Sequence, residues 1–105
     1  AADATPPRSA LLLRAYPNPF NPETRLHVNL PEQGEFVLTV YNLLGEAVAQ
    51  LFSGSLPPGE HQYAWDARNR SGQAVSSGLY LFSGVFRAAH SGRVQRVVEK
   101  VVYLK

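Results

Sequence analysis

Apolar and polar side chains mostly alternate along this chain, and clusters of glycine and proline interrupt the alternation at short intervals. Leu26, Val28 and Leu30, for example, are apolar, whereas the residues between them are polar. A period of two turns successive side chains to opposite faces of a β-sheet, and frequent turn residues keep strands short. The pattern therefore predicts an all-β chain.

We expect about seven strands, at residues 10–16, 25–30, 36–41, 47–52, 61–65, 79–86 and 94–104. Residues 79–86 are apolar on both faces, with only Gly84 interrupting the run, which predicts a central strand. Turns are expected at 42–46 and 69–72, where Gly72 can adopt a positive φ. Strands with a buried face need a second layer, so the predicted fold is an antiparallel sandwich of two sheets.

The last predicted strand has an ambiguous pattern. Its five valines follow the spacing of an amphipathic helix, at Val94, Val97, Val98, Val101 and Val102. β-Branched side chains, however, lose rotamer freedom in a helix and fit a pleated surface. We therefore expect a long strand, with a bend or bulge near residues 95–97 that shifts the phase of alternation.

The composition fits a linker followed by one domain. The chain has 105 residues, 45% of them apolar, and a formal net charge of +2. Residues 1–9 hold two prolines among small and polar residues, so we expect a linker there and a folded domain over 10–105. The missing initiator methionine favours a module from a longer protein. No stretch has the length and apolarity of a membrane span, and the start lacks a signal-peptide pattern.

Catalytic chemistry has few candidate residues here. Without cysteine, disulfides, thiolate metal sites and cysteine nucleophiles are excluded. Asp66 is expected to accept hydrogen bonds from the backbone of its own loop. His27, His61 and His90 lack the spacing of metal ligands, and the arginines of loop 66–72 disfavour calcium. We predict no catalytic residue, no metal and no cofactor, and therefore no enzyme activity.

Two kinds of binding surface are alternatives. Trp65 and the ten Tyr and Phe residues can form an aromatic platform for sugars, as in carbohydrate-binding sandwich modules, or they can form the core. Five Lys and Arg residues against the single acid Glu99 follow residue 86, which suits either an anionic partner or a solvated strand face. These cations are not interleaved with stacking aromatic residues, so we expect no nucleic-acid partner.

Several short motifs occur in a defined order. They are Tyr16-Pro17-Asn18-Pro19-Phe20-Asn21-Pro22, Val40-Tyr41-Asn42-Leu43-Leu44-Gly45-Glu46, Leu56-Pro57-Pro58-Gly59, Tyr63-Ala64-Trp65-Asp66, Ser77-Gly78-Leu79-Tyr80 and Lys100-Val101-Val102-Tyr103-Leu104-Lys105. In order and spacing the chain resembles the C-terminal sorting domain of proteins exported by the type IX secretion system of Bacteroidetes and their relatives. That family overlaps in sequence with the immunoglobulin-like domain of the flagellar hook-capping protein.

The resemblance implies an immunoglobulin-like antiparallel β-sandwich that directs a secreted cargo through the periplasm and across the outer membrane to the cell surface. The implied partners are the outer-membrane secretion and sortase machinery, an N-terminal cargo domain in the same chain, and anionic lipopolysaccharide, to which the sortase links the cargo. Cleavage would fall within residues 1–10. The family's recognition segments correspond to Pro17, Asn18, Pro19, Gly78, Tyr80, Lys100, Val101, Val102, Tyr103, Leu104 and Lys105.

The same segments also have structural interpretations. Prolines between residues 17 and 22 remove amide donors, so this segment should cross between the sheets, with Asn18 and Asn21 satisfying local backbone groups. Gly78 is expected in a backbone conformation that excludes a Cβ, which sets the register of Tyr80. The chain stops abruptly on an apolar-basic segment, which fits a terminus that a receptor reads, for instance by strand addition. A structural immunoglobulin-like spacer is the third possibility.

Overall fold

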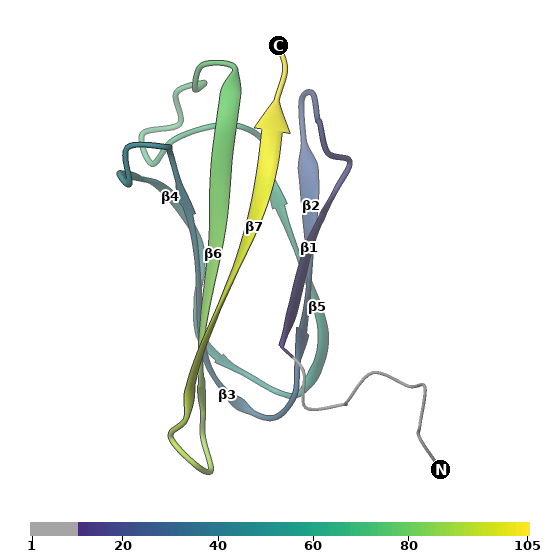
Figure 1. The fold of residues 1–105 in the computed structure, drawn as a ribbon, viewed down its shortest axis with the longest axis vertical. Helices are drawn as coiled ribbons and strands as arrows, with labels where there is room; N and C mark the ends of the chain where they lie inside the picture. Colours follow the sequence, from purple (N-terminus) through teal and green to yellow (C-terminus); the bar gives the residue numbers. More distant parts are fainter. Residues whose placement is uncertain (1–10) are drawn as a thin grey trace.

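The computed structural model describes residues 11–105, which form seven strands in two antiparallel sheets (Figure 1). The strands are β1 (Leu12–Tyr16), β2 (Thr24–Leu30), β3 (Gly34–Tyr41), β4 (Ala47–Leu56), β5 (Gly59–Trp65), β6 (Gly78–Ala88) and β7 (Val94–Tyr103). The predicted linker, its cleavage region and the predicted domain start at residue 10 lie outside the described residues. None of the described residues forms a helix long and apolar enough to cross a membrane.

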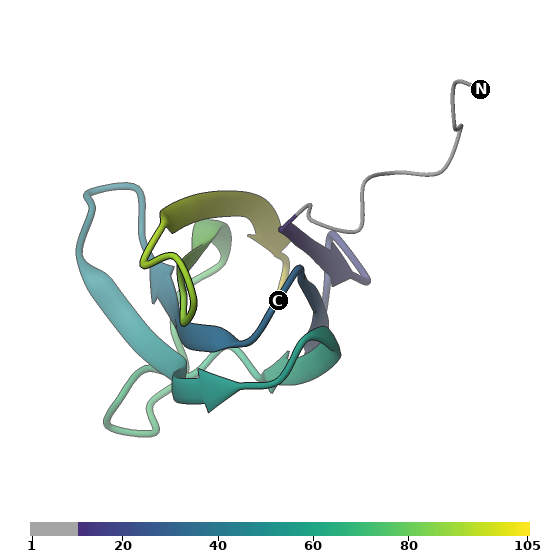
Figure 2. The same ribbon diagram turned by 90° about the horizontal axis from the view of Figure 1, so that it is seen from below.

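The two sheets pack face to face as the sandwich that the sequence predicts. One has the strand order β1-β2-β5 and the other β4-β3-β6-β7. β6 lies between β3 and β7, so the prediction of a central strand is confirmed. In a view down the long axis of the sandwich, β7 lies beside β1 at one side (Figure 2).

The core consists of the inward-facing residues of both sheets. The alternate apolar residues of β2 and β3 are buried as expected, and three phenylalanines fill the centre: Phe36, Phe82 and Phe86. Gly84 of β6 faces this cluster, because a Cβ there would lie 3.0 Å from the ring of Phe36. A close approach between a ring and the backbone is thus the reason for a glycine within a central strand.

The last segment is a strand, as predicted, but the expected bulge near residues 95–97 is absent. The β6–β7 register runs without interruption from Arg87 opposite Val94 to Gly78 opposite Tyr103. Odd-numbered residues of β7 face inward throughout, and Glu99 is one of them. Its Oε2 accepts a hydrogen bond from the backbone N of Ala15 at 3.1 Å. The helix-like spacing of valines therefore arises because polar residues occupy part of the inward face.

The bulges occur in β4, which is also longer than predicted. Its pairing with β3 shifts between Leu38 and Thr39 and again between Val40 and Tyr41. The two extra residues on β4 are Leu51 and Val48, and both pack partly buried against the core. Bulges thus bring apolar residues inward that strict alternation would expose.

Candidate functional site

The proline-rich segment after β1 pairs with the end of β7. Phe20 forms a parallel bridge with Tyr103, its N donating to Val102 O at 2.9 Å and its O accepting from Leu104 N at 3.1 Å. Asn18 extends this pairing: its Nδ2 donates to Lys100 O at 2.8 Å, and its Oδ1 accepts from Val102 N at 3.0 Å. The expectation that Asn18 satisfies local backbone groups is therefore wrong, because its partners lie more than 80 residues away.

The start of β6 pairs with the other edge of the last part of β7. Gly78, Leu79 and Tyr80 lie opposite Tyr103, Val102 and Val101. Beyond the strand, the backbone N of Lys105 donates to Ser77 Oγ at 2.9 Å. Gly78 has φ +152°, a conformation essentially restricted to glycine, as the sequence predicts. The end of the chain is thus held on both sides.

An aromatic cluster supports this end from inside the sandwich. The ring of Phe20 stacks on Tyr103 with centroids 5.1 Å apart and lies 5.7 Å from Trp65. Trp65 also contacts Tyr80 edge-on at 5.2 Å. These four rings are at most 6% exposed. Their packing fixes the position of the pairing segments relative to the core.

Two side-chain hydrogen bonds to backbone carbonyl oxygens anchor the aromatic cluster. Trp65 Nε1 donates to Arg68 O at 3.0 Å, and the Tyr80 hydroxyl donates to Ser76 O at 2.7 Å. Trp65 is only 2% exposed, so it cannot serve as the face of a sugar platform.

Tyr63, half-buried against Phe52, also faces inward, and burial raises the pKa of its phenol above the usual value.

The structure brings all the predicted recognition residues together, but it divides them by exposure. Val101, Tyr103 and Tyr80 are buried, so a partner of the folded domain cannot contact their side chains directly. Gly78 and Val102 are partly exposed. The exposed members are Pro17, Asn18, Pro19, Lys100, Leu104 and Lys105. The surface available for recognition is therefore the proline segment and the last exposed side chains.

Strand addition by this terminus, suggested by the sequence, does not fit the folded domain. On the side that faces away from β6, Lys100 O and Val102 N already bond to Asn18, and Val102 O and Leu104 N already bond to Phe20. A receptor strand would first have to displace the segment around Phe20. Recognition of the folded state would instead use side chains.

Sequence reasoning missed three residues that build this site. Phe20 joins the proline segment to the core, and its signal is a large apolar residue among prolines and asparagines. Thr24 is fully buried, and its Oγ1 donates to Pro17 O at 2.8 Å. Ser77 accepts from Lys105, a contact that no local pattern indicates.

Two further loops lie at this end of the sandwich, and they share one hydrogen-bond arrangement. Asn42 Oδ1 accepts from the amides of Leu44 and Glu46, and Asn69 Oδ1 accepts from those of Ser71 and Gln73. In both loops a glycine at positive φ follows three residues after the asparagine. The turns predicted at 42–46 and 69–72 are thus confirmed.

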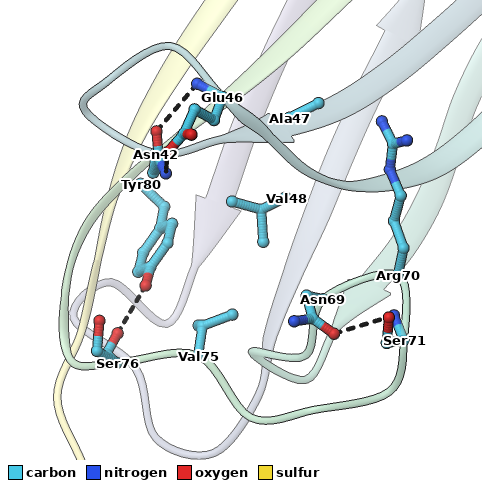
Figure 3. A pocket seen from close by; sticks show the side chains of 10 residues that line it. All are labelled: Asn42, Glu46, Ala47, Val48, Asn69, Arg70, Ser71, Val75, Ser76 and Tyr80. Carbon is cyan, nitrogen blue, oxygen red and sulfur yellow. Dashed lines mark hydrogen bonds between the residues drawn. The ribbon is translucent and has the colours of Figure 1, made fainter.

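The loop after β5 has a different acceptor from the one expected. Asn69, and not Asp66, accepts from its backbone amides, while Asp66 pairs with Arg68 at 3.6 Å on the exposed surface. Between the two asparagine loops lies a hollow of about 500 Å³, shown in Figure 3. Its lining includes Val48, Val75 and the Tyr80 ring.

His27 and His61 occupy neighbouring positions on the paired strands β2 and β5 but lie on opposite faces of the sheet, and His90 follows β6. His27 and His90 are exposed, and His61 Nε2 lies 2.8 Å from the carbonyl oxygen of Pro57. Within residues 11–105, no three His, Asp or Glu side chains gather as candidate metal ligands.

The fold and the sequence define an immunoglobulin-like β-sandwich domain. The family model described as FlgD Ig-like domain matches residues 18–85, and the chain belongs to this family. The matched region begins at Asn18 and ends within β6, so it includes residues 18–22 of the proline segment and both asparagine loops but not residues 100–105. Comparison with curated proteins gave no match.

Three solved structures show the same fold. Dimeric latent PorU from Porphyromonas gingivalis has a TM-score of 0.71 and 16% identity over 88% of this chain and 9% of that one. FlgD from P. aeruginosa has a TM-score of 0.61 and 21% identity over 76% and 60%. PorZ, described as an essential surface component of the type-IX secretion system of P. gingivalis, has a TM-score of 0.53 and 18% identity over 89% and 11%. The chain spans less than two thirds of each of these proteins.

Proposed function

We propose that this chain is a non-catalytic sorting domain, which directs a cargo domain preceding it through the periplasm and across the outer membrane to the cell surface by type IX secretion. The observation that carries this proposal is the joining of the three predicted recognition segments at one end of the sandwich. The proline segment, the start of β6 and residues 100–105 hold one another by backbone and side-chain hydrogen bonds. The shared fold with PorZ, which is named as a type-IX component, supports it further.

The shape of the domain suits this role. β1 begins at the end of the sandwich opposite Lys105 (Figure 1). A cargo attached before β1 would therefore stand away from Leu104 and Lys105. Secretion and sortase machinery could then bind the exposed end of the domain while the cargo stays at a distance. Lipopolysaccharide, in this proposal, is the acceptor to which the sortase links the cargo.

The experiment must separate recognition from folding. Deleting residues 101–105 would remove Val101 and Tyr103, which are buried. We would instead fuse a periplasmic reporter before residue 10, express it in a type IX-competent host, and change the exposed side chains with Leu104→Asp and Lys105→Glu. Both changes keep the backbone hydrogen bonds of these residues. The expected result is a reporter retained in the periplasm.

The matched control is Leu12→Asp with Arg14→Glu, an exposed leucine and an exposed cation on β1. This pair should leave surface display unchanged, and both doubly substituted domains should unfold at the temperature of the parent. Normal display of the variant altered at 104 and 105 would contradict the sorting role.

A structural spacer is the second candidate, because the family is that of the FlgD Ig-like domain. As a spacer, the chain would tolerate both double substitutions equally. A carbohydrate-binding role has less support, since Trp65, its principal candidate side chain, lies in the core.

A further inference from the structure

The outward face of β7 combines valines with cations and carries no acid. Because the alternation is unbroken, the even-numbered residues point outward: Val94, Arg96, Val98, Lys100 and Val102. The one acid of the strand, Glu99, points inward toward β1. Two of these residues are well exposed, Val94 at 48% and Val98 at 59%.

Neighbouring strands extend this apolar surface. The register places Val85 of β6 between Val37 of β3 and Arg96 of β7, all on the outer face. It likewise places Leu81 between Tyr41 and Lys100. Outward-facing residues of β-sandwiches are ordinarily polar, and contiguous exposed apolar surface marks an interaction site. A hollow of about 590 Å³ lies on this face, lined in part by Val37, Val85 and Val94.

The charges on this face have mostly one sign. Arg87, Arg96 and Lys100 are exposed on it, and Glu35, opposite Arg87, is its one acid within the described strands β3, β6 and β7. The outer face of the other sheet differs, because it is mainly polar. Its members in β1, β2 and β5 are Leu12, Arg14, Tyr16, Arg25, His27, Asn29, Glu60, Gln62 and Ala64.

We propose that the outer face of β3, β6 and β7 binds an acidic polypeptide, whose carboxylates meet Arg87, Arg96 and Lys100 while its apolar side chains cover the valines. Charge complementarity selects this partner. A second copy of the chain would bring the same cations together. An anionic membrane fits less well, because the most exposed apolar residues of this face are the short valines Val94 and Val98, whereas Leu81 and Tyr41 are only partly exposed. The inference does not depend on the sorting role.

The test uses a capped peptide of alternating glutamate and valine, titrated into the full isotope-labelled chain and followed by NMR. Amide resonances of β6 and β7 should shift. The same peptide with glutamine in place of glutamate should bind at least about tenfold more weakly. Arg96→Glu with Lys100→Glu should weaken binding of the glutamate peptide to a similar extent. Val98→Thr should weaken it about threefold, because the apolar contact is reduced.

The matched control is Arg14→Glu with Arg25→Glu, two exposed strand cations on the outer face of the other sheet. It should leave the affinity unchanged. Equal loss of affinity in both double variants, or equal binding of the two peptides, would overturn the proposal. So would tighter binding to vesicles containing phosphatidylglycerol, abolished by Arg96→Glu with Lys100→Glu, or dimerisation of the chain through this face. The sorting test changes residues 104 and 105, so either proposal can fail without the other.

Discussion

Trp65 is the residue on which the aromatic packing converges. Its ring contacts Phe20, Tyr80 and Phe82 at centroid distances between 5.2 and 5.7 Å, and these residues come from two separate parts of the chain, the segment after β1 and strand β6. Its Nε1 donates to Arg68 O, so the buried polar atom is satisfied. One side chain thus joins the end of β5 to β6 and to the proline segment.

Truncating this ring should cost much of the stability of the domain. We expect Trp65→Ala to lower the free energy of unfolding by about 3–5 kcal/mol, since it leaves a cavity and removes the ring contacts. Urea unfolding followed by far-ultraviolet circular dichroism measures it without a tryptophan signal. Tyr16→Ala is the control, because Tyr16 is 76% exposed. A loss well under 1 kcal/mol for Trp65→Ala would contradict the observed packing.

Gly84 tests the packing of the phenylalanine core from the backbone side. A Cβ at this position would lie 3.0 Å from the ring of Phe36 and 3.2 Å from Val97 Cγ1. Gly84→Ala should therefore destabilise the domain by about 1–3 kcal/mol through overpacking. Ser83→Ala, on the outward face of the same strand, is the matched substitution and should stay within about 0.5 kcal/mol of the parent. Equal midpoints for the two variants in urea would show that the core accommodates the methyl group.

Among the elements, β7 is unusual because its two edges are held by different means. β6 pairs with its whole length, whereas the segment around Asn18 and Phe20 pairs only with its last part. Asn18 uses its amide side chain as a substitute for backbone groups, accepting from Val102 and donating to Lys100. Besides β6, Ser77 and the backbone of Phe20, the end of β7 is therefore held by a side chain remote in sequence.

Removing that side chain should loosen the end of β7 more than the rest of the sandwich. Asn18→Ala is expected to reduce global stability by about 1 kcal/mol and to speed hydrogen exchange at Val102 and Leu104. Exchange at Phe82, in the centre of the sheet, should change only by the global loss. Asn21→Ala, an exposed asparagine of the same segment, should leave all three amides unaffected. If hydrogen exchange in Asn18→Ala were faster to the same extent at all amides, Asn18 would not hold the end of β7 locally.

The strands whose alternation is regular could be predicted from the sequence, and those shaped by distant contacts could not. β2 follows its pattern because one of its faces is apolar and buried, and β6 because its apolar run on both faces is typical of a central strand. β7 departs from its pattern because Glu99 faces inward to meet the amide of Ala15, a contact that only the folded arrangement creates. The motifs singled out segments that the structure joins at one end of the sandwich, but the sequence predicted local partners for Asn18, since nothing in its neighbourhood indicates Lys100 or Val102.

At the scale of the whole molecule, the two ends of the sandwich differ. One carries the proline segment, the two asparagine loops and Lys105, and β1 begins toward the other (Figure 1). All four features at the first end are held by side-chain hydrogen bonds. A rigid end of this kind suits recognition of a folded domain.

The difference between the two ends leads to a prediction about where a reporter protein can be attached. A folded reporter joined directly after Lys105 should abolish surface display, because it would cover Leu104 and Lys105, whereas the same reporter placed before residue 10 should be carried to the surface. Protease digestion of intact cells measures the display of each fusion. Purified versions of both should unfold at the same temperature as the parent domain, since Lys105 is exposed and its side chain is not part of the core. Equal surface display of the two fusions would mean that no export component recognises the end of the domain around Leu104 and Lys105. The spacer role would then account better for the fold.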